Sequence, residues 1–329
     1  MDKGMGRFRG IFSFVLFLGT IVGSACDSLA GSSEGCGFID LRSKVPLKVR
    51  NQGDISWCYA HTVADLLQYF SGLETQISAA DIAIRYNKGL WPRFYRWING
   101  SLVPETGFVR PAIQDALEMG YCPEEVFPSE HWTRISRVGE DVFQVEKKRL
   151  NAAISEILDL QRLIKARIFT ASKEIPFYYE FPGVDQAAFF SILEENPRQE
   201  VLDGLRLKAC EGKRKPYPEG FGPVSMYFRG PSMLEHIHEQ LEQERPVSVD
   251  YFYGLLEDSG AIKRKLSELH TSLLMGQRYD VASGECQYLI KNSYGESCSG
   301  YDPHWECQAG YLWVGESALR RALVSYVVP

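Results

Sequence analysis

The chain has 329 residues, of which 45% are hydrophobic and 24% are charged, and its formal net charge is −6. This composition is that of an ordinary globular protein, long enough for two packed lobes and a further segment. An acidic chain without a basic stripe excludes nucleic acid as the expected partner.

Residues 1–25 are typical of an export signal. A basic start is followed by an apolar run at residues 11–22 and by small residues at 23–25. The apolar run, about a dozen residues, is too short to span a bilayer comfortably, and we expect no transmembrane span in the rest of the chain. Removing the segment deletes three basic residues and Asp2, which takes the net charge from −6 to −8. We therefore expect an exported protein in the periplasm, outside the cell or at the cell envelope.

Cys26 directly follows the expected cleavage point, and its setting resembles a bacterial lipoprotein site. Lipidation of Cys26 would tether the mature chain to a membrane surface. The alternative is ordinary cleavage after Ala25, which leaves one cysteine without a partner. The sequence leaves both alternatives open.

Cysteine parity favours three disulfides in an oxidising compartment. The chain has eight cysteines, and an even number remains after Cys26 and one nucleophile are set aside. Cys298 and Cys307 lie in one loop that contains Gly, Ser and Pro, so we expect them to pair. We also expect Cys122 to pair with Cys210.

Residues 36–128 have the pattern of a compact helical lobe. Apolar residues recur there at intervals of three and four, as they do along the buried face of a helix. Capping residues mark where these helices begin and end. The expected helices are Cys58–Phe70, Ala79–Tyr86 after an N-cap at Ser78, and Pro111–Met119 before Gly120.

Residues 129–222 differ in character. Apolar residues between Phe143 and Ile168 recur at intervals of three, four or seven, which predicts one long amphipathic helix. A second helix is expected at Asp185–Glu195 and a third after Pro197. This segment is therefore predicted to be helical.

Residues 223–329 turn to β character, with short β-branched or aromatic runs bounded by Gly, Pro and charged turns. One helix, about Ser232–Glu244, is expected among them. The expected strands are Val224–Phe228, Pro246–Tyr253, Thr271–Gln277, Gln287–Asn292 and Tyr311–Val314. A helical half followed by a strand-rich half predicts an α+β enzyme with two lobes and a cleft between them.

The segment from Asn51 to Ala60 carries the strongest chemical signal. Cys58 begins a predicted helix, where free N–H groups and the helix dipole favour thiolate over thiol. Gln52 lies six residues earlier, and its amide can donate to an oxyanion formed beside the sulfur. Far downstream, His270 can act as a base and Asn292 can orient it. We therefore expect Cys58 to be a thiolate well below neutral pH.

Read in this order, Gln52, Cys58, His270 and Asn292 resemble the papain-like cysteine peptidases. The most specific match is Ile-Lys-Asn-Ser-Tyr-Gly at residues 290–295, which is similar to the family's Ile-Lys-Asn-Ser-Trp-Gly. The resemblance implies a papain-like two-lobe fold and a bacterial, exported member of the family. It implies that Cys58 is the nucleophile, that His270 is the base and that Asn292 orients the imidazole.

The same resemblance assigns two supporting residues. Gln52 and the Cys58 N–H would form the oxyanion hole, and Tyr294 would shield the histidine–asparagine bond from water. The surroundings of Cys58 depart from the family pattern, since Ile55 replaces a cysteine and Trp57 replaces a small residue. The chemistry needs no metal ion and no organic cofactor.

The spacing between nucleophile and base predicts an insertion. The separation is 270 − 58 = 212 residues, about 60–80 more than in papain-type enzymes. We therefore predict a helical lobe at 36–128, a helical insertion at 129–222 and a β-rich lobe at 223–329. The insertion is expected either to cover the cleft or to decorate the outer surface of the first lobe.

We thus expect a monomeric cysteine peptidase that acts on peptide or protein substrates. Two rivals remain: an acyltransferase that uses the same chemistry, and an inactive papain-like scaffold that binds peptides or a partner. His61, three residues after Cys58, is an alternative base.

Overall fold

The computed structural model describes residues 36–45, 47–88, 107–138, 143–169, 175–218, 221, 224–228, 230, 232–265 and 268–329. The predicted export signal, residues 1–25, and the lipidation candidate Cys26 lie outside the described residues and stay predictions.

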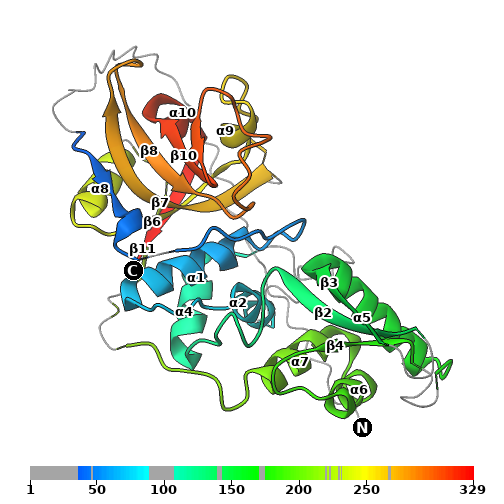
Figure 1. Cartoon of the computed structure of the whole chain (residues 1–329). Helices are drawn as coiled ribbons and strands as arrows, with labels where there is room; N and C mark the ends of the chain where they lie inside the picture. Colours follow the sequence, from blue (N-terminus) through cyan, green and yellow to red (C-terminus); the bar gives the residue numbers. More distant parts are fainter. Residues whose placement is uncertain are drawn as a thin grey trace, which may run out of the picture. The chain divides into compact units, whose positions relative to one another are not determined.

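The predicted α+β class is confirmed, because the helices gather in the first two thirds of the chain and most strands come later (Figure 1). The helices are α1 Cys58–Ser71, α2 Ala79–Tyr86, α4 Val109–Met119, α5 Leu150–Lys165, α6 Gln186–Glu195, α7 Val201–Ala209, α8 Met233–Glu242, α9 Gly254–Glu257 and α10 Glu316–Ala322. The strands are β1 Ile39–Asp40, β2 His131–Arg137, β3 Phe143–Arg149, β4 Phe177–Glu180, β5 Ser225–Phe228, β6 Val247–Phe252, β7 Leu269–Asp280, β8 Glu285–Lys291, β9 Glu306–Gln308, β10 Tyr311–Gly315 and β11 Leu323–Val328.

Helix α1 is the central element of the helical lobe. It ends at Gly72, which adopts the left-handed conformation with φ 59° that glycine tolerates best. The side chains of residues 59–68 are all buried, because α1 packs against α2 and α4 on one side and against β7 on another. The predicted cap of α2 is present, since the Ser78 hydroxyl accepts from the Asp81 N–H at 3.0 Å.

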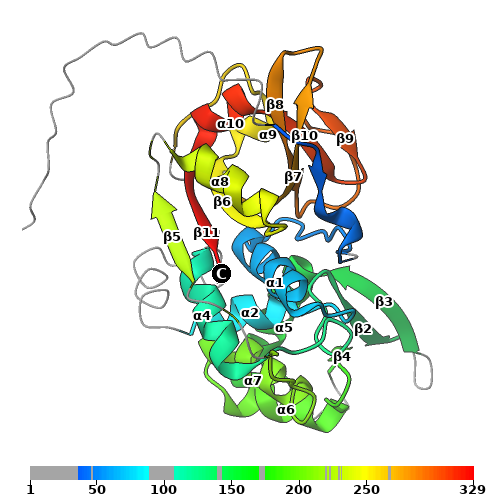
Figure 2. The same ribbon diagram turned by 90° about the vertical axis from the view of Figure 1, so that its left-hand side faces the viewer.

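The β-rich part is one antiparallel sheet in the order β5-β11-β6-β7-β8-β10-β9, and β1 also pairs with β7. Helix α8 lies against β6 and β7, and α10 lies against β8 and β10 (Figure 2). A side chain at Gly276 would meet the Ile39 carbonyl oxygen at 2.3 Å, so the approach of β1 requires glycine there. The first described residues therefore belong to this sheet rather than to the helical lobe.

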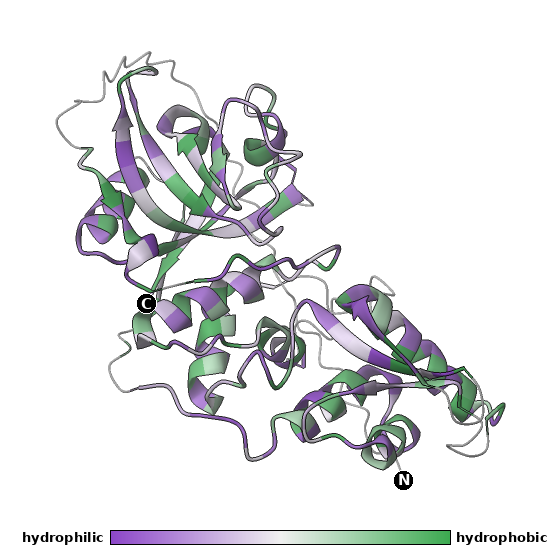
Figure 3. Cartoon of the chain, viewed as in Figure 1, coloured by the Kyte–Doolittle hydropathy of each residue, from purple (hydrophilic) through white to green (hydrophobic). Residues whose placement is uncertain are grey.

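The segment 143–149 corrects one prediction, because it is strand β3 and not the beginning of a long helix. Strand β3 pairs with β2 from His131↔Arg149 to Arg137↔Phe143, and β2 pairs with β4. Phe143, the first residue of the predicted stripe, is more than half exposed, and so is Ile168, the last, which lies beyond the end of the helix at Lys165. The helix begins at Leu150 and buries one face. Figure 3 accordingly shows both hydrophilic and hydrophobic residues along α5, as in an amphipathic helix.

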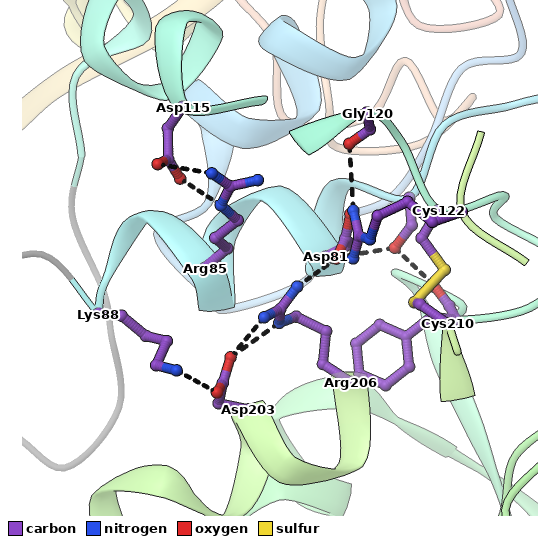
Figure 4. Close-up of polar contacts among 12 residues, drawn as sticks. Asp81, Arg85, Lys88, Asp115, Gly120, Cys122, Asp203, Arg206 and Cys210 are labelled. Carbon is purple, nitrogen blue, oxygen red and sulfur yellow. Dashed lines mark hydrogen bonds and ion pairs between the residues drawn. A yellow bond between two sulfur atoms is a disulfide. The ribbon is translucent and has the colours of Figure 1, made fainter. Parts of the chain in front are cut away.

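Residues 129–222, the predicted segment between the lobes, are attached to residues of the predicted helical lobe by a disulfide and by ion pairs (Figure 4). Asp81 on α2 accepts from Arg206 at 2.9 Å and from Arg214 at 2.6 Å. The disulfide Cys122–Cys210 lies beside these ion pairs. The boundaries 129 and 222 stay a prediction, but the chain is joined across this segment by the Cys122–Cys210 disulfide and by the bridge between Tyr121 and Lys215.

The predicted disulfides Cys298–Cys307 and Cys122–Cys210 are confirmed, with Cα–Cα distances of 5.8 and 5.7 Å. A third disulfide, Cys36–Cys286, joins positions 250 residues apart. Three disulfides are compatible with the predicted oxidising compartment. Within the described ranges, every helix is too short or too polar to cross a membrane.

A buried ion cluster, formed by Asp65, Arg50 and Lys291, joins α1 to the sheet. One Asp65 oxygen accepts from the Arg50 guanidinium at 3.0 Å, and the other accepts from the Lys291 ammonium. All three side chains are 6% exposed or less. Buried charges are tolerated only when they are paired, so this cluster fixes how α1 lies against β8.

Replacing Asp65 with alanine is expected to lower the free energy of unfolding by about 3–5 kcal/mol, because two buried cations lose their carboxylate. Denaturant unfolding followed by circular dichroism measures the change. Asp159→Ala, which removes an exposed partner of Arg162 on α5, is the matched control and is expected to cost little. Equal costs for the two variants would contradict a structural role for the Asp65 cluster.

Candidate active site

Cys58 is the first residue of α1, at the end where backbone N–H groups have no intrahelical acceptor. Thr271, on β7, and the backbone of Tyr59 both act to lower the pKa of the Cys58 thiol through hydrogen bonding, so the sulfur lies near the start of β7. The Thr62 hydroxyl also donates to the Thr271 carbonyl at 3.3 Å. The first turn of α1 is therefore tied to the strand that carries His270.

His270 and Asn292 come together because β7 and β8 are antiparallel neighbours. His270 Nε2 lies 2.7 Å from Asn292 Oδ1, and both side chains are buried. The Ser272 hydroxyl also donates to Asn292 Oδ1, at 3.2 Å, while Asn292 Nδ2 donates to the Tyr301 hydroxyl at 2.9 Å. These contacts define which end of the amide faces the imidazole, and they leave Nδ1 as the ring nitrogen for a second partner.

Three tyrosine rings enclose the imidazole of His270. Tyr294 stacks on it with ring centroids 5.1 Å apart and planes 12° from parallel. Tyr251 and Tyr253 meet it edge-on at 5.6 and 5.4 Å. An ionised Cys58 would raise the pKa of the Tyr294 and Tyr251 hydroxyls, so the sulfur lies within electrostatic range of the same rings. Tyr294 and Tyr251 therefore contact the imidazole of His270 and also sense the charge of Cys58.

Gln52 lies in a loop, residues 51–54, that is held from the β-rich side. Its backbone N–H donates to the Ser293 carbonyl at 2.8 Å, and its side-chain oxygen accepts from the Ser293 hydroxyl at 2.5 Å. Its amide nitrogen donates to the Ile55 carbonyl at 2.7 Å, which uses one of two N–H groups. Gly295, at φ 82°, turns the chain so that its N–H reaches the Arg50 carbonyl.

Burial favours the neutral form of both titrating groups, although Cys58 itself is partly exposed. Desolvation raises the pKa of the Cys58 thiol to about 11, and the nearby Asp250 carboxylate acts in the same direction. Desolvation lowers the pKa of His270 to about 4, although its bond to Asn292 raises it. Both shifts run against the predicted thiolate, which stays a prediction for the alkylation experiment described below. The helix start favours the thiolate, but the loss of hydration outweighs it.

His61, the alternative base, lies deeper in the core. It is 1% exposed, and neither ring nitrogen has a hydrogen-bond partner among the described residues. Burial and the charges of Arg50 and Lys291 hold its pKa well below the usual value. A histidine that faces two cations in the core is poorly suited to accept a proton from Cys58.

Sequence reasoning missed three side chains near this site: Ser293, which holds the Gln52 amide, Tyr301, which accepts from Asn292, and Asp250. The carboxylate of Asp250 accepts from the Thr271 and Ser325 hydroxyls at 2.6 Å each, and burial raises its pKa. An aspartate inside a predicted buried strand was the available signal. The roles of Ser293 and Tyr301 depend on distant pairings that no local pattern carries.

One group of three potential metal ligands occurs among the described residues, namely Cys36, Cys286 and Glu316. The two sulfur atoms of this group form a disulfide, so they are not available to a metal ion.

Known structures resemble the chain over most of its length at low sequence identity. Procathepsin L 3 from the larval midgut of Tenebrio molitor is 15% identical, with a TM-score of 0.44, over 92% of this chain and 72% of that one. A mite allergen from a study of Blo t 1 and Der p 1 is 13% identical, with a TM-score of 0.44, over 94% and 75%. The proform of the ragweed cysteine protease Amb a 11 is 13% identical, with a TM-score of 0.47, over 90% and 67%.

No protein-family model matches the chain, and no curated protein matches it. The function proposed below therefore rests on the residues of this chain.

Alkylation of Cys58 by iodoacetamide is expected to accelerate about tenfold per pH unit between pH 6 and 9, because the thiolate fraction rises that steeply below the pKa. The pKa of Cys58, raised to about 11, lies above this whole range. Mass spectrometry of the labelled peptide measures the rate.

Asp250→Asn is expected to speed alkylation at each pH, since it removes a negative charge that raises the pKa of the thiol. The control Asp280→Asn alters a carboxylate at the last residue of β7 and is expected to leave the rate unchanged. A rate that is already constant from pH 5 upward would instead show a thiolate–imidazolium pair.

Proposed function

We propose that this protein is a papain-like cysteine peptidase that hydrolyses peptide bonds through Cys58, His270 and Asn292, with Gln52 in the oxyanion hole. The observation that carries the proposal is the 2.7 Å hydrogen bond that His270 Nε2, on β7, donates to Asn292 Oδ1. This bond is of the kind that sets the tautomer of a catalytic imidazole.

The first half of the reaction transfers the acyl group to the enzyme. As the sulfur attacks the peptide carbonyl carbon, the Cys58 thiol gives its proton to His270 Nδ1. The carbonyl oxygen becomes an oxyanion that accepts from the Cys58 N–H and the free N–H of Gln52. His270 then gives the proton to the leaving amine, the C–N bond breaks, and a thioester remains.

The second half restores the enzyme. His270 takes a proton from water, the hydroxide attacks the thioester, and the C–S bond breaks as the sulfur recovers a proton from His270. Asn292 keeps Nε2 protonated throughout, so the proton always moves at Nδ1. Because burial favours the neutral form of both groups, His270 acts as a general base in step with attack.

A catalytically inactive peptide-binding protein is the second candidate, and a specific observation favours it. The pKa of about 11 for Cys58 and about 4 for His270 oppose transfer of the proton before substrate arrives. Apart from burial, the groups that act most on the pKa of the thiol are Thr271, Asp250 and Tyr59 rather than His270. Such a protein would bind peptides without cleaving them.

Hydrolysis of an unstructured protein such as casein tests the first candidate against the second. We expect cleavage by the mature chain, no cleavage by Cys58→Ala, and a loss of at least about 10²-fold in kcat/KM for His270→Ala. His236→Ala, on α8, is the matched control and should retain full activity. Binding of peptides without cleavage by the unaltered chain would establish the inactive scaffold instead.

The pH profile of the same reaction provides a second check. The rate constant kcat/KM is expected to fall as the pH decreases through about 4, because protonated His270 cannot accept the thiol proton. An acid limb near the ordinary histidine value of about 6.5 would contradict full burial of the base during catalysis.

Ser293→Ala is expected to lower kcat by about tenfold while KM changes by less than about twofold, because the Gln52 amide can then rotate away from the oxyanion. Ser297→Ala, in the exposed loop that follows, is the control. An unchanged kcat for Ser293→Ala would separate Gln52 from the oxyanion hole.

A further inference from the structure

The loop that carries Gln52, residues Asn51–Asp54, is held from two sides. On the β-rich side Gln52 bonds to Ser293, and Asn51 forms a bridge with Tyr294. Within the loop the Gly53 N–H donates to the Asn51 side-chain oxygen at 2.9 Å. None of these contacts uses the Asn51 N–H or the Asp54 carboxylate, which lie at the two ends of the loop.

The segment between the lobes occupies those two ends. Glu130 Oε1 accepts from the Asn51 N–H at 3.2 Å. Asn151 Nδ2 donates to Asp54 Oδ2 at 3.0 Å. One contact therefore lies on each side of Gln52 and Gly53. The two partner residues are 79 and 97 positions further along the chain.

Glu130 and Asn151 are presented to the loop as a pair. The β2–β3 ladder ends at His131↔Arg149, and the Leu150 N–H continues it by donating to the Glu130 carbonyl at 3.1 Å. The Asn151 side-chain oxygen accepts from the Ala152 N–H at 2.7 Å, where α5 begins. The end of a hydrogen-bonded ladder and the start of a helix thus fix the spacing between the two side chains.

We propose that Glu130 and Asn151 are positioning residues that hold the Gln52 loop where the Gln52 amide can stabilise an oxyanion. The proposal rests on the peptidase function proposed above. A donor in an oxyanion hole acts only when it is already placed where charge develops, so small displacements of the loop reduce the rate. The segment between the lobes then contributes to catalysis without touching substrate.

Kinetics of Glu130→Ala and Asn151→Ala test this role. Each variant is expected to lower kcat by about threefold to thirtyfold with KM within about twofold, because the lost interaction matters only in the transition state. Glu130→Gln keeps the accepting oxygen and should restore most of the activity. Ser191→Ala, which removes an exposed side-chain bond on α6 of the same segment, is the matched control.

A second readout separates the oxyanion hole from the nucleophile. Iodoacetamide alkylation of Cys58 forms no oxyanion, so Glu130→Ala should alkylate at the rate of the unaltered chain while its kcat falls. In a Gln52→Ala background, Glu130→Ala should have no further effect on kcat, because the group it positions is gone.

The outcomes that would contradict the positioning role differ from the outcome that would also contradict the proposed function. Equal losses of kcat and alkylation rate, or a full effect of Glu130→Ala in the Gln52→Ala background, would overturn the positioning role. So would an active unaltered enzyme whose Glu130→Ala and Asn151→Ala variants keep full kcat. An unaltered chain that is alkylated at Cys58 but cleaves no peptide would overturn the proposed function and this inference together.

Discussion

The buried carboxylate of Asp65 is the contact on which the candidate site depends. It pairs with Arg50 and Lys291, and each of these three residues lies close along the chain to one component of the site. Arg50 precedes Gln52 by two residues, Asp65 lies on the helix that begins at Cys58, and Lys291 precedes Asn292. A buried ion pair tolerates little displacement, since either partner left alone would be an uncompensated charge in the core. The segments that carry Gln52, Cys58 and Asn292 are therefore held in one position relative to one another.

The surroundings of His270 restrict the motion of its imidazole, but they also lower its pKa. Three tyrosine rings and Asn292 leave the imidazole almost no freedom, which favours a defined geometry for proton transfer. The same enclosure removes water, so the neutral forms of His270 and Cys58 are favoured at rest. A substrate that brings its own carbonyl dipole to the sulfur would change this balance. Burial therefore accounts for both the order of the site and its neutral resting state.

The segment between the lobes is bound to its surroundings in two different ways. The Cys122–Cys210 disulfide and the ion pairs of Asp81 attach it firmly to the helical lobe. Two hydrogen bonds, one accepted by Glu130 and one donated by Asn151, connect it to the Gln52 loop. Whether the segment also covers a cleft or only decorates the first lobe stays a prediction. Its attachment to α2 makes it a fixed neighbour of the loop, because a disulfide and buried ion pairs oppose large separations.

Much of the local structure was determined by the sequence alone. The Ser78 cap, the glycine after α4, the beginning of α1 at Cys58 and the Cys298–Cys307 pairing all follow from residues near one another in the chain, so local chemistry predicts them. The sequence also named Gln52, Cys58, His270 and Asn292 as candidates, because their chemistry is a property of residue type and order. Only the tertiary structure decided that 143–149 is a strand, that Ser293 holds Gln52 and that Cys36 pairs with Cys286. It also decided the directions of the pKa shifts at Cys58 and His270. Strand pairing and desolvation depend on which distant segments pack together, and no local pattern contains that information.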